Sequence, residues 1–438
     1  MILAAAIFIA VYIGLIVSKR HRWAIAWGGV LLALVISALS RHQVLMLPEI
    51  LGKSDILKVS DVILHGINWN VVGIFTGSLF IAELFIYSNM PETISDVLVN
   101  RSSSLGRAFL MVVIFASVFS IFMDNVITVL IIAPIALQLT RKAGVSPVPV
   151  VIGLAVSSNL QGMAILIGDT PSMLLAAQEK LNFLDFFFYQ GKPSIFWIVQ
   201  LGAIAGFGVL YLFFRKNVQR PGIIPVTPVK SWVPFWLIVI VIILLSFMNR
   251  FDSKFEWFGG TVCMLVGLGG FLWYKVRSRG EKEKMKWGLD WGTVAFLMAV
   301  FALVHMLTKN GVVEAVIGRL DALQGMSPFL IYSAIVWGSV LISAFIDNIP
   351  YIAAMLPLVS GLSASLGLDP ALLAFGVLIG SCMGGNITPI GAVANLVAMG
   401  ILEREGRPIS FGSFVRIGLP FTLAATTVSW IVLWFIYN

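Results

Sequence analysis

The chain is poor in charge. Only 11% of its 438 residues are charged, whereas a soluble globular chain carries about 25%. It also lacks the segments of roughly ten alternating apolar and polar residues that are typical of membrane β-barrels. Instead, 59% of its residues are hydrophobic, and they gather in long runs such as 2–17, 70–87, 232–248 and 417–436. Because a membrane-crossing helix needs about 20 mostly apolar residues, the sequence predicts an all-α polytopic membrane protein.

Several functional classes lack their signatures. There is no P-loop to bind ATP phosphates, and no His, Cys and carboxylate set has the spacing of a metal site. The cysteines, Cys263 and Cys382, both lie in apolar runs and predict no disulfide framework. The net charge of +8 does not indicate nucleic-acid binding, because the basic residues sit in short loops between apolar runs. We therefore expect no enzyme activity, no cofactor, no metal and no nucleic-acid partner.

The apolar run 2–17 is interpreted as a retained span rather than a signal peptide. It has no basic region before it, and no cleavage-like site comes after it. The sequence therefore predicts an integral protein of a lipid bilayer, and a prokaryotic inner membrane is the expected location.

The two halves of the chain repeat each other. An offset of 223 positions brings identical residues together, namely Asp124 with Asp347, Asn125 with Asn348, Ser158 with Ser381, Gly162 with Gly385 and Gly168 with Gly391. An offset of 222 aligns Trp69 with Trp291. We divide the chain into a first repeat over 1–214, a cytoplasmic linker over 215–231 and a second repeat over 232–438.

Each repeat contains one long apolar segment interrupted at Asp-Asn and another interrupted by glycine. The first kind is too long for one crossing, so we predict a re-entrant hairpin with Asp-Asn at its tip. The second kind is predicted to be a broken helix, because its glycines and prolines would unwind it. The hairpins are predicted at 106–140 and 326–360, and the broken helices at 147–178 and 370–402. With about five full crossings besides its hairpin, each repeat has an odd number, so the second repeat should be inverted relative to the first.

The residues at these interruptions are candidate site residues. A charged carboxylate in hydrocarbon costs roughly 2.5–3.5 kcal/mol, so Asp124 and Asp347 need a reason to be there. They can cap the second hairpin helix, and we expect the remaining carboxylate charge to face a site. Asp169 lies in the first broken helix, where the second repeat has Ala392. We predict proton coupling by Asp124, Asp347 and Asp169.

The same reasoning predicts a wider set of contacts to a solute or ion. Unwinding frees backbone groups, and neutral side chains nearby can add ligands. A single break would be interpreted as a packing kink, but two at equivalent positions with polar side chains favour a site. The predicted set is Asp124, Asn125, Thr128, Ser158, Asn159, Gly168, Asp169, Thr170, Asp347, Asn348, Ser381, Asn386, Thr388, Gly391 and Asn395. Glu83 and His305, at equivalent positions, fit either a packed helix or a functional role.

Four stretches carry a resemblance to a known group of proteins. SIFMDNVITVLIIAPIAL, SAFIDNIPYIAAMLPLV, LIGDTPSMLL and GGNITPIGAVANLVAMGILE resemble the ion transporter superfamily. That group holds arsenite permeases of the ArsB type, NhaD-type sodium/proton antiporters, the melanosomal pink-eyed dilution protein and, more distantly, sodium-coupled dicarboxylate and citrate carriers. The resemblance spans essentially the whole chain. It implies ten or so spans, two opposed hairpins and often a homodimer that works by an elevator motion.

One departure bears on the cargo. In the dicarboxylate branch the hairpin tips read Ser-Asn-Thr and help to hold sodium, whereas here they read Asp-Asn-Val at 124–126 and Asp-Asn-Ile at 347–349. Two added carboxylates would repel an anion. We therefore expect a secondary transporter that exchanges a small inorganic solute for protons, with arsenite-like oxyacid efflux as the first hypothesis. Sodium/proton antiport, sodium- or proton-coupled carboxylate or anion transport, and a passive channel are the alternatives. The inverted repeat favours a carrier over a channel.

The distribution of basic residues predicts the topology. With the N-terminus outside, the loops assigned to the cytoplasm, among them 19–22, hold 20 of the 29 lysines and arginines, as the positive-inside rule requires. A single cysteine placed in 215–230 or in 275–286 should therefore react with a membrane-impermeant thiol reagent in inside-out vesicles and not in intact cells. Labelling of either loop from outside would contradict the inverted arrangement.

Overall fold

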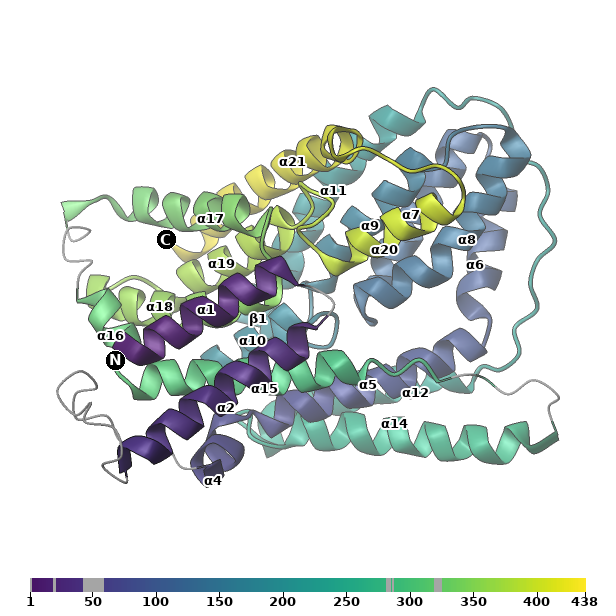
Figure 1. Ribbon diagram of the computed structural model, residues 1–438. Coiled ribbons are helices and arrows are strands. Elements are labelled where there is room, and N and C mark those ends of the chain that lie inside the picture. The colour runs from purple at the N-terminus through teal and green to yellow at the C-terminus, as the bar shows by residue number, and fades with distance from the viewer. Residues whose placement is uncertain (1, 19–20, 42–58, 281–284, 286, 319–324) are drawn as a thin grey trace.

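The computed structural model describes residues 2–18, 21–41, 59–280, 285, 287–318 and 325–438 (Figure 1). Within these residues, seven helices are long and apolar enough to cross a membrane, and several shorter apolar helices accompany them. The described strands are β1 (Phe188–Tyr189) and β2 (Lys192–Pro193), which form one small antiparallel hairpin. The fold is therefore that of an all-α polytopic membrane protein.

The hairpins, the broken helices and the helix that follows each broken helix come in the same order in the two halves. The first half contains α1 (Ile2–Val17), α2 (Arg22–Arg41), α4 (Val59–Asp61), η1 (Val62–Gly66), α5 (Trp69–Tyr87), α6 (Met90–Arg101), α7 (Leu105–Ser120), α8 (Asn125–Ala143), α9 (Val148–Gly162), α10 (Thr170–Glu179), η2 (Phe183–Phe186), β1, β2 and α11 (Ile195–Phe214). The second half contains α12 (Val233–Ser246), α13 (Met248–Phe251), α14 (Phe258–Arg277), η3 (Ser278–Gly280), α15 (Trp291–Lys309), α16 (Val312–Ile317), α17 (Pro328–Ser343), α18 (Asn348–Leu366), α19 (Pro370–Gly384), α20 (Val393–Arg404) and α21 (Phe411–Tyr437). Helices α7 and α8 form the first hairpin, α17 and α18 the second, and α9–α10 and α19–α20 are the broken helices.

Equivalent residues start and stop the hairpin helices. The Ser104 hydroxyl oxygen accepts a hydrogen bond from the Arg107 amide, and Ser327 does the same for Leu330. At the far ends, Gly144 and Gly367 adopt left-handed φ values of 66° and 65°, which glycine tolerates without steric cost. The repeat thus places equivalent capping residues at the ends of both hairpins.

The two halves are interlocked by an exchange of helices. Helix α2 of the first half packs on α15 of the second, and α14 of the second half packs on α5 of the first. Figure 1 shows α2, α5, α12, α14 and α15 along one side of the molecule, with the hairpins, the broken helices, α11 and α21 on the other. We call the first group, together with α1, the α5/α15 layer, and the second group the hairpin layer.

Small residues allow α5 and α14 to approach closely. A Cβ added to Gly77 would lie 2.3 Å from the carbonyl carbon of Cys263, and one added to Gly73 would lie 2.8 Å from the Cα of Gly260. Small residues at helix crossings are typical of membrane proteins, where packing rather than the hydrophobic effect drives helix association.

This crossing gives a test of the fold. Gly77→Ala should destabilise the protein by about 1–3 kcal/mol, because the new methyl group overpacks a backbone contact. Gly269→Ala is the matched control on α14, since a Cβ there would meet nothing within 4 Å and alanine favours a helix over glycine. Thermal unfolding of the purified variants measures both effects. An unchanged midpoint for Gly77→Ala would contradict the close crossing.

Candidate transport site

The hairpin tips are turns capped by the predicted aspartates. The Asp124 Oδ1 atom accepts hydrogen bonds from the amides of Val126 at 2.8 Å and Ile127 at 3.3 Å. Asp347 Oδ1 accepts one from the Ile349 amide at 3.3 Å. Each carboxylate thereby satisfies free N–H groups at the start of α8 or α18, so the capping role predicted from the sequence is confirmed.

A serine ties each hairpin to its broken helix in the same way. The Ser120 hydroxyl at the end of α7 donates to the Ser158 carbonyl of α9 at 2.9 Å. The Ser343 hydroxyl at the end of α17 donates to the Ser381 carbonyl of α19 at 2.6 Å. Because the donors and acceptors are related by the repeat, each hairpin tip contacts its broken helix at the equivalent residue.

Glycines let the chain double back at both breaks. A Cβ on Gly168 would lie 2.3 Å from the Gly162 carbonyl oxygen, and a Cβ on Gly391 would lie 2.5 Å from the equivalent Gly385 oxygen. The two breaks differ in the residue that precedes the next helix. Asp169 caps α10 by accepting from the Thr170 amide at 2.8 Å, whereas Ala392, which precedes α20, offers no side-chain cap.

Asn159 connects the two repeats at the breaks. Its side-chain nitrogen, Nδ2, donates to the Cys382 carbonyl at 2.8 Å and to Asn386 Oδ1 at 2.9 Å. Its side-chain oxygen accepts from Asn125 Nδ2 at 2.9 Å, and that nitrogen also lies 3.3 Å from Asp169 Oδ2. One buried amide therefore joins a hairpin tip, its own broken helix and the broken helix of the other repeat.

A cavity of about 380 Å³ lies in front of both tips. Seven of the predicted residues line it, namely Asp124, Asn125, Asn159, Asp169, Thr170, Asp347 and Asn348. The structure thus brings the three predicted proton-coupling aspartates to one cavity. Whether they carry protons stays a prediction.

The other predicted residues lie behind the cavity wall and shape the breaks. The Thr388 hydroxyl donates to the Ala344 carbonyl, and Asn395 Nδ2 donates to the carbonyls of Gly385 at 2.8 Å and Thr388 at 2.9 Å. The full set behind the wall is Thr128, Ser158, Gly168, Ser381, Asn386, Thr388, Gly391 and Asn395, all of them buried. The hydroxyl groups of this set and the Asn395 amide donate to backbone carbonyls, and none of the set lines the cavity in this conformation.

Three polar residues of the cavity were not identified from the sequence. Arg22, Asp290 and Thr293 also line it. The charge pattern places Arg22 in a cytoplasmic loop, and its spacing gives no sign of this position. For Asp290 the sequence does contain an indication, because the repeat aligns it with Asn68. These two residues cap α15 and α5 respectively. With Asp124, Asp169 and Asp347, it brings the cavity wall to four carboxylates and one guanidinium among the described residues.

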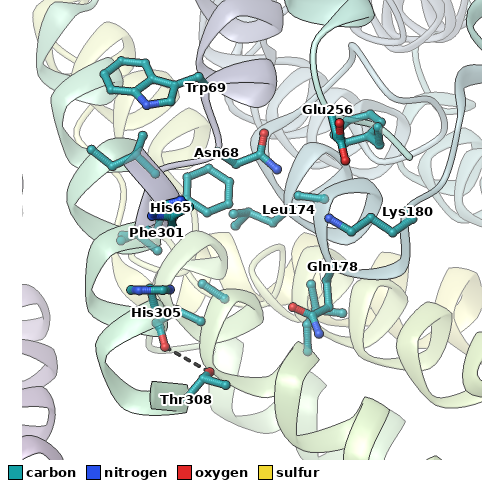
Figure 2. A pocket seen from close by; sticks show the side chains of 18 of the residues that line it. His65, Asn68, Trp69, Leu174, Gln178, Lys180, Glu256, Phe301, His305 and Thr308 are labelled. Atoms are coloured by element: carbon teal, nitrogen blue, oxygen red, sulfur yellow. Dashed lines mark hydrogen bonds between the residues drawn. The ribbon is translucent and has the colours of Figure 1, made fainter. Parts of the chain in front are cut away.

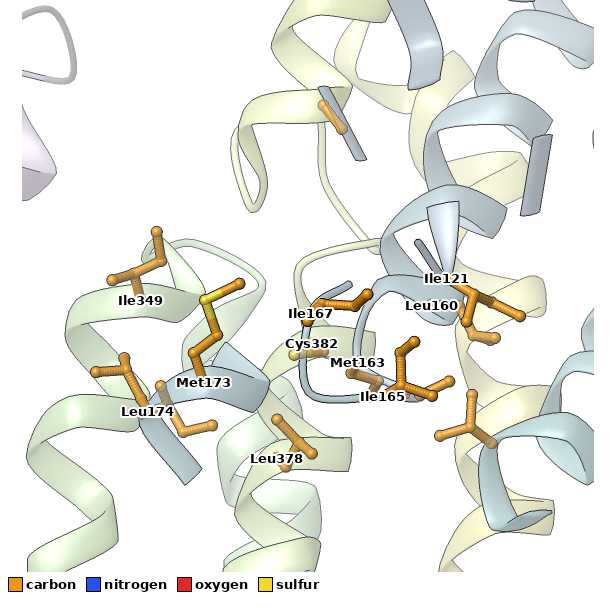
Figure 3. Close-up of a cluster of buried hydrophobic side chains, with 14 of the residues drawn as sticks. Ile121, Leu160, Met163, Ile165, Ile167, Met173, Leu174, Ile349, Leu378 and Cys382 are labelled. Carbon is orange, nitrogen blue, oxygen red and sulfur yellow. The ribbon is translucent and has the colours of Figure 1, made fainter. Parts of the chain in front are cut away.

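An apolar cluster backs the breaks (Figure 3). It includes Ile121, Leu160, Met163, Ile165, Ile167 and Cys382. Cys382 is fully buried in this cluster and is absent from the residues that line the cavity. Its sulfur atom accepts a hydrogen bond from Asn348 Nδ2 at 3.9 Å, so the thiol is held behind the second hairpin tip and does not face a solute in this conformation.

A second cavity, of about 410 Å³, lies beside α15 and α18 (Figure 2). Four of its lining residues, Gly66, Asn68, Phe301 and Ala353, stand at positions equivalent to Gly288, Asp290, Leu79 and Leu130 of the first cavity. His305 lines it, 3.4 Å from Asp61, and a hydrogen bond from Lys309 holds the pKa of Asp61 below its usual value. Glu83, at the position equivalent to His305, instead accepts a hydrogen bond from the Gly288 amide at the first cavity. The tip aspartates line the first cavity and not the second.

Comparisons with known proteins agree with this architecture. Residues 12–380 match the model of a family described as citrate transporter. An uncharacterised transporter of Mycobacterium tuberculosis is 27% identical over 91% of this chain and 93% of its own length. A 46 kDa membrane protein of Mycobacterium leprae is 28% identical over 100% of this chain and 99% of its own. The P protein of Mus musculus is 24% identical, with 91% of this chain and 58% of that protein covered.

A solved structure shares the fold. The YdaH transporter of Alcanivorax borkumensis, whose topology is described as unusual, superposes with a TM-score of 0.61 at 14% identity. The match covers 94% of this chain and 98% of that one. At this identity the likeness extends to the fold alone.

The position of Asn159 between the repeats predicts a specific loss. Asn159→Ala should lower stability by about 1–3 kcal/mol, because it leaves buried donors and acceptors unpaired, and it should abolish transport by separating the tip from both breaks. Gln161→Ala is the matched control on α9. It removes two hydrogen bonds between the side-chain amides of Gln161 and Gln200, of 2.8 and 2.7 Å, and Gln161 does not line the cavity. Thermal unfolding and proteoliposome flux measure the two effects. Equal transport by both variants would contradict a special role for Asn159.

Proposed function

Because the chain belongs to the citrate transporter family and is an integral membrane transporter, we propose that it exchanges a cation for protons through the cavity in front of the hairpin tips. The observation that carries this proposal is the charge of the cavity wall, four aspartates against one arginine. The cavity lies where the broken helices of two inverted repeats meet, which is the usual place of substrate and ion sites in secondary transporters. Oxygen atoms of carboxylates and amides are the ligands that hard cations prefer.

Exchange follows from the cost of charge in the membrane. A site that crosses hydrocarbon with uncompensated carboxylates is strongly disfavoured. Either a proton or a metal cation can neutralise Asp124, Asp169 or Asp347, and the two compete for the same oxygen atoms. A carrier that moves only when these carboxylates are neutralised will therefore exchange one for the other. The two repeat-related cavities supply one access path for each side of the membrane.

The same charge argues against a free polycarboxylate as cargo. A citrate anion in this cavity would face four carboxylates and one guanidinium, and the repulsion is strong where water is excluded. Citrate could enter this site only in a protonated form or as a complex with cations. The carboxylate alternative thus requires a neutralised complex.

The order of the hypotheses changes accordingly. Sodium/proton antiport, an alternative in the sequence analysis, now comes first, because the cavity offers carboxylate and amide oxygens. Efflux of an uncharged oxyacid such as arsenite comes second, since asparagine and threonine side chains can hydrogen-bond its hydroxyl groups. The buried thiol of Cys382 gives it no further support.

The proposal is tested in proteoliposomes that contain a pH-sensitive dye. An inward gradient of sodium or lithium should alkalinise the lumen, and an outward gradient should acidify it. The rate of the pH change should saturate as the cation concentration rises. Asp124→Asn, Asp169→Asn and Asp347→Asn should each reduce the exchange rate at least about tenfold, a loss expected when a charged ligand is removed. Asp369→Asn is the control, because Asp369 caps α19 and is absent from the cavity lining. The half-saturating cation concentration should rise as the pH falls, because protons compete for the carboxylates.

Two results would overturn this proposal. One is full, pH-coupled cation exchange by all three aspartate variants, which would reduce the acids to helix caps. The other is a pH response to arsenite or to citrate with none to sodium or lithium, which would reinstate one of the other cargoes.

A further inference from the structure

Arg22 contributes the guanidinium group of an otherwise acidic cavity. Its Nη1 atom lies 3.3 Å from Asp347 Oδ2, and its Nη2 atom donates to the Thr293 hydroxyl at 2.7 Å. The guanidinium also stands over the ring of Phe296, 5.2 Å from its centre. The side chains of Arg22 and Asp347 are only 18% and 14% exposed, so water screens this pair weakly.

These contacts belong to two different layers of the molecule. Arg22 begins α2, and Thr293 and Phe296 belong to α15, on which α2 packs. Asp347 caps α18 at the tip of the second hairpin. Arg22 is therefore positioned by the α5/α15 layer and reaches across to the hairpin layer. The ion pair is a bond between two groups of helices that would have to move past each other for the site to change sides.

The first hairpin tip differs from the second in this respect. No ion pair within the described part of the chain involves Asp124, although it occupies the position equivalent to Asp347. The repeat explains why both tips carry an aspartate, but it does not explain why one of them is paired with arginine. The pairing is a property of this half of the cavity.

We propose that Arg22 is a tethered counter-cation that occupies Asp347 while the cavity is empty and is displaced when a cation or a proton takes that carboxylate. The ion pair latches the second hairpin to the α5/α15 layer, so an unloaded carrier stays in this conformation. Loading releases the latch and lets the site move. The identity of the displacing ion rests on the proposed function, whereas the latch rests on the contact between the layers.

The released guanidinium has another acceptor within its own layer. The charged groups around it are Asp347, Asp290 and Asp124, all acidic. Asp290 Oδ2 accepts from the same Thr293 hydroxyl that Arg22 contacts. Arg22 can therefore exchange Asp347 for Asp290 without leaving an unpaired charge, which would be costly in a weakly hydrated site.

The test follows the conformation with a cysteine reporter. Leu130 lines the cavity and is half exposed, so Leu130→Cys in a background of Cys263→Ala and Cys382→Ala reports access to the cavity. In the absence of sodium and lithium, Arg22→Gln should slow labelling by an impermeant thiol reagent in inside-out vesicles at least about fivefold, the lower end of typical coupling between linked sites. Asp347→Asn should have the same effect, and the double variant should add nothing, because both remove one interaction.

Further variants separate this role from a general structural one. Arg141→Gln is the matched control, because it breaks an ion pair with Glu405 that also joins the two halves but is absent from the cavity lining, and it should leave labelling unchanged. Arg22→Lys keeps the charge and should restore part of the rate, even if Arg22→Gln folds poorly. Arg22→Gln should also lower the half-saturating sodium concentration, since a competitor is removed.

The outcomes distinguish this inference from the proposed function. Unchanged labelling in both Arg22 variants, with sodium exchange intact, would overturn the latch and leave the exchange function standing. A labelling change in Arg22→Gln that Asp347→Asn reproduces, in a protein that exchanges neither sodium nor lithium, would support the latch and overturn the proposed cargo. A labelling change of equal size in Arg141→Gln would overturn the latch, because any lost ion pair between the halves would then suffice.

Discussion

The polar backbone at the two helix breaks must be satisfied inside a membrane, and much of the structure near the site serves that requirement. Hydrocarbon offers no hydrogen-bond partners, so an interrupted helix is stable only where protein groups replace them. Here serine hydroxyls bond a carbonyl near each break, and asparagine amides bond carbonyls of the second break. The glycines let the chain double back within contact distance of the preceding helix end. These groups gather in one place because each break lies against the other, with Asn159 shared between them.

The same place is where carboxylates can be accommodated. Asp124, Asp169, Asp290 and Asp347 each cap a helix through one oxygen atom, which explains why the fold tolerates them. Their common position around a single cavity gives them a second property, a concentrated negative charge. Arg22 partly balances that charge from the opposite layer. The side chains that cap these helices are thus also the ones that give the cavity its negative charge.

The repeats share an architecture but differ in chemistry. Asn159 stands where the second repeat has Cys382, Asp169 where it has Ala392, and Glu83 where it has His305. Among these residues, Asn159, Asp169 and Ala392 line the first cavity, and His305 lines the second. A transporter with identical halves would present the same site to both sides of the membrane. The walls of the two cavities are therefore chemically distinct.

The class of fold, the repeat and the residues at the interruptions can be predicted from the sequence, because each depends on local properties. Hydrophobic run length, a constant offset, and the intolerance of helices for glycine, proline and buried aspartate can all be read along the chain. Packing between distant segments places some of those residues at the cavity and others behind its wall. Thr388, Asn395 and Asn348 are all polar residues at an interruption of an apolar segment, so the sequence does not distinguish them. The exchange of α2 and α14 between the halves likewise depends on packing between segments far apart in the chain. Arg22 reaches the cavity through that exchange, so no pattern near residue 22 could have placed it beside Asp347.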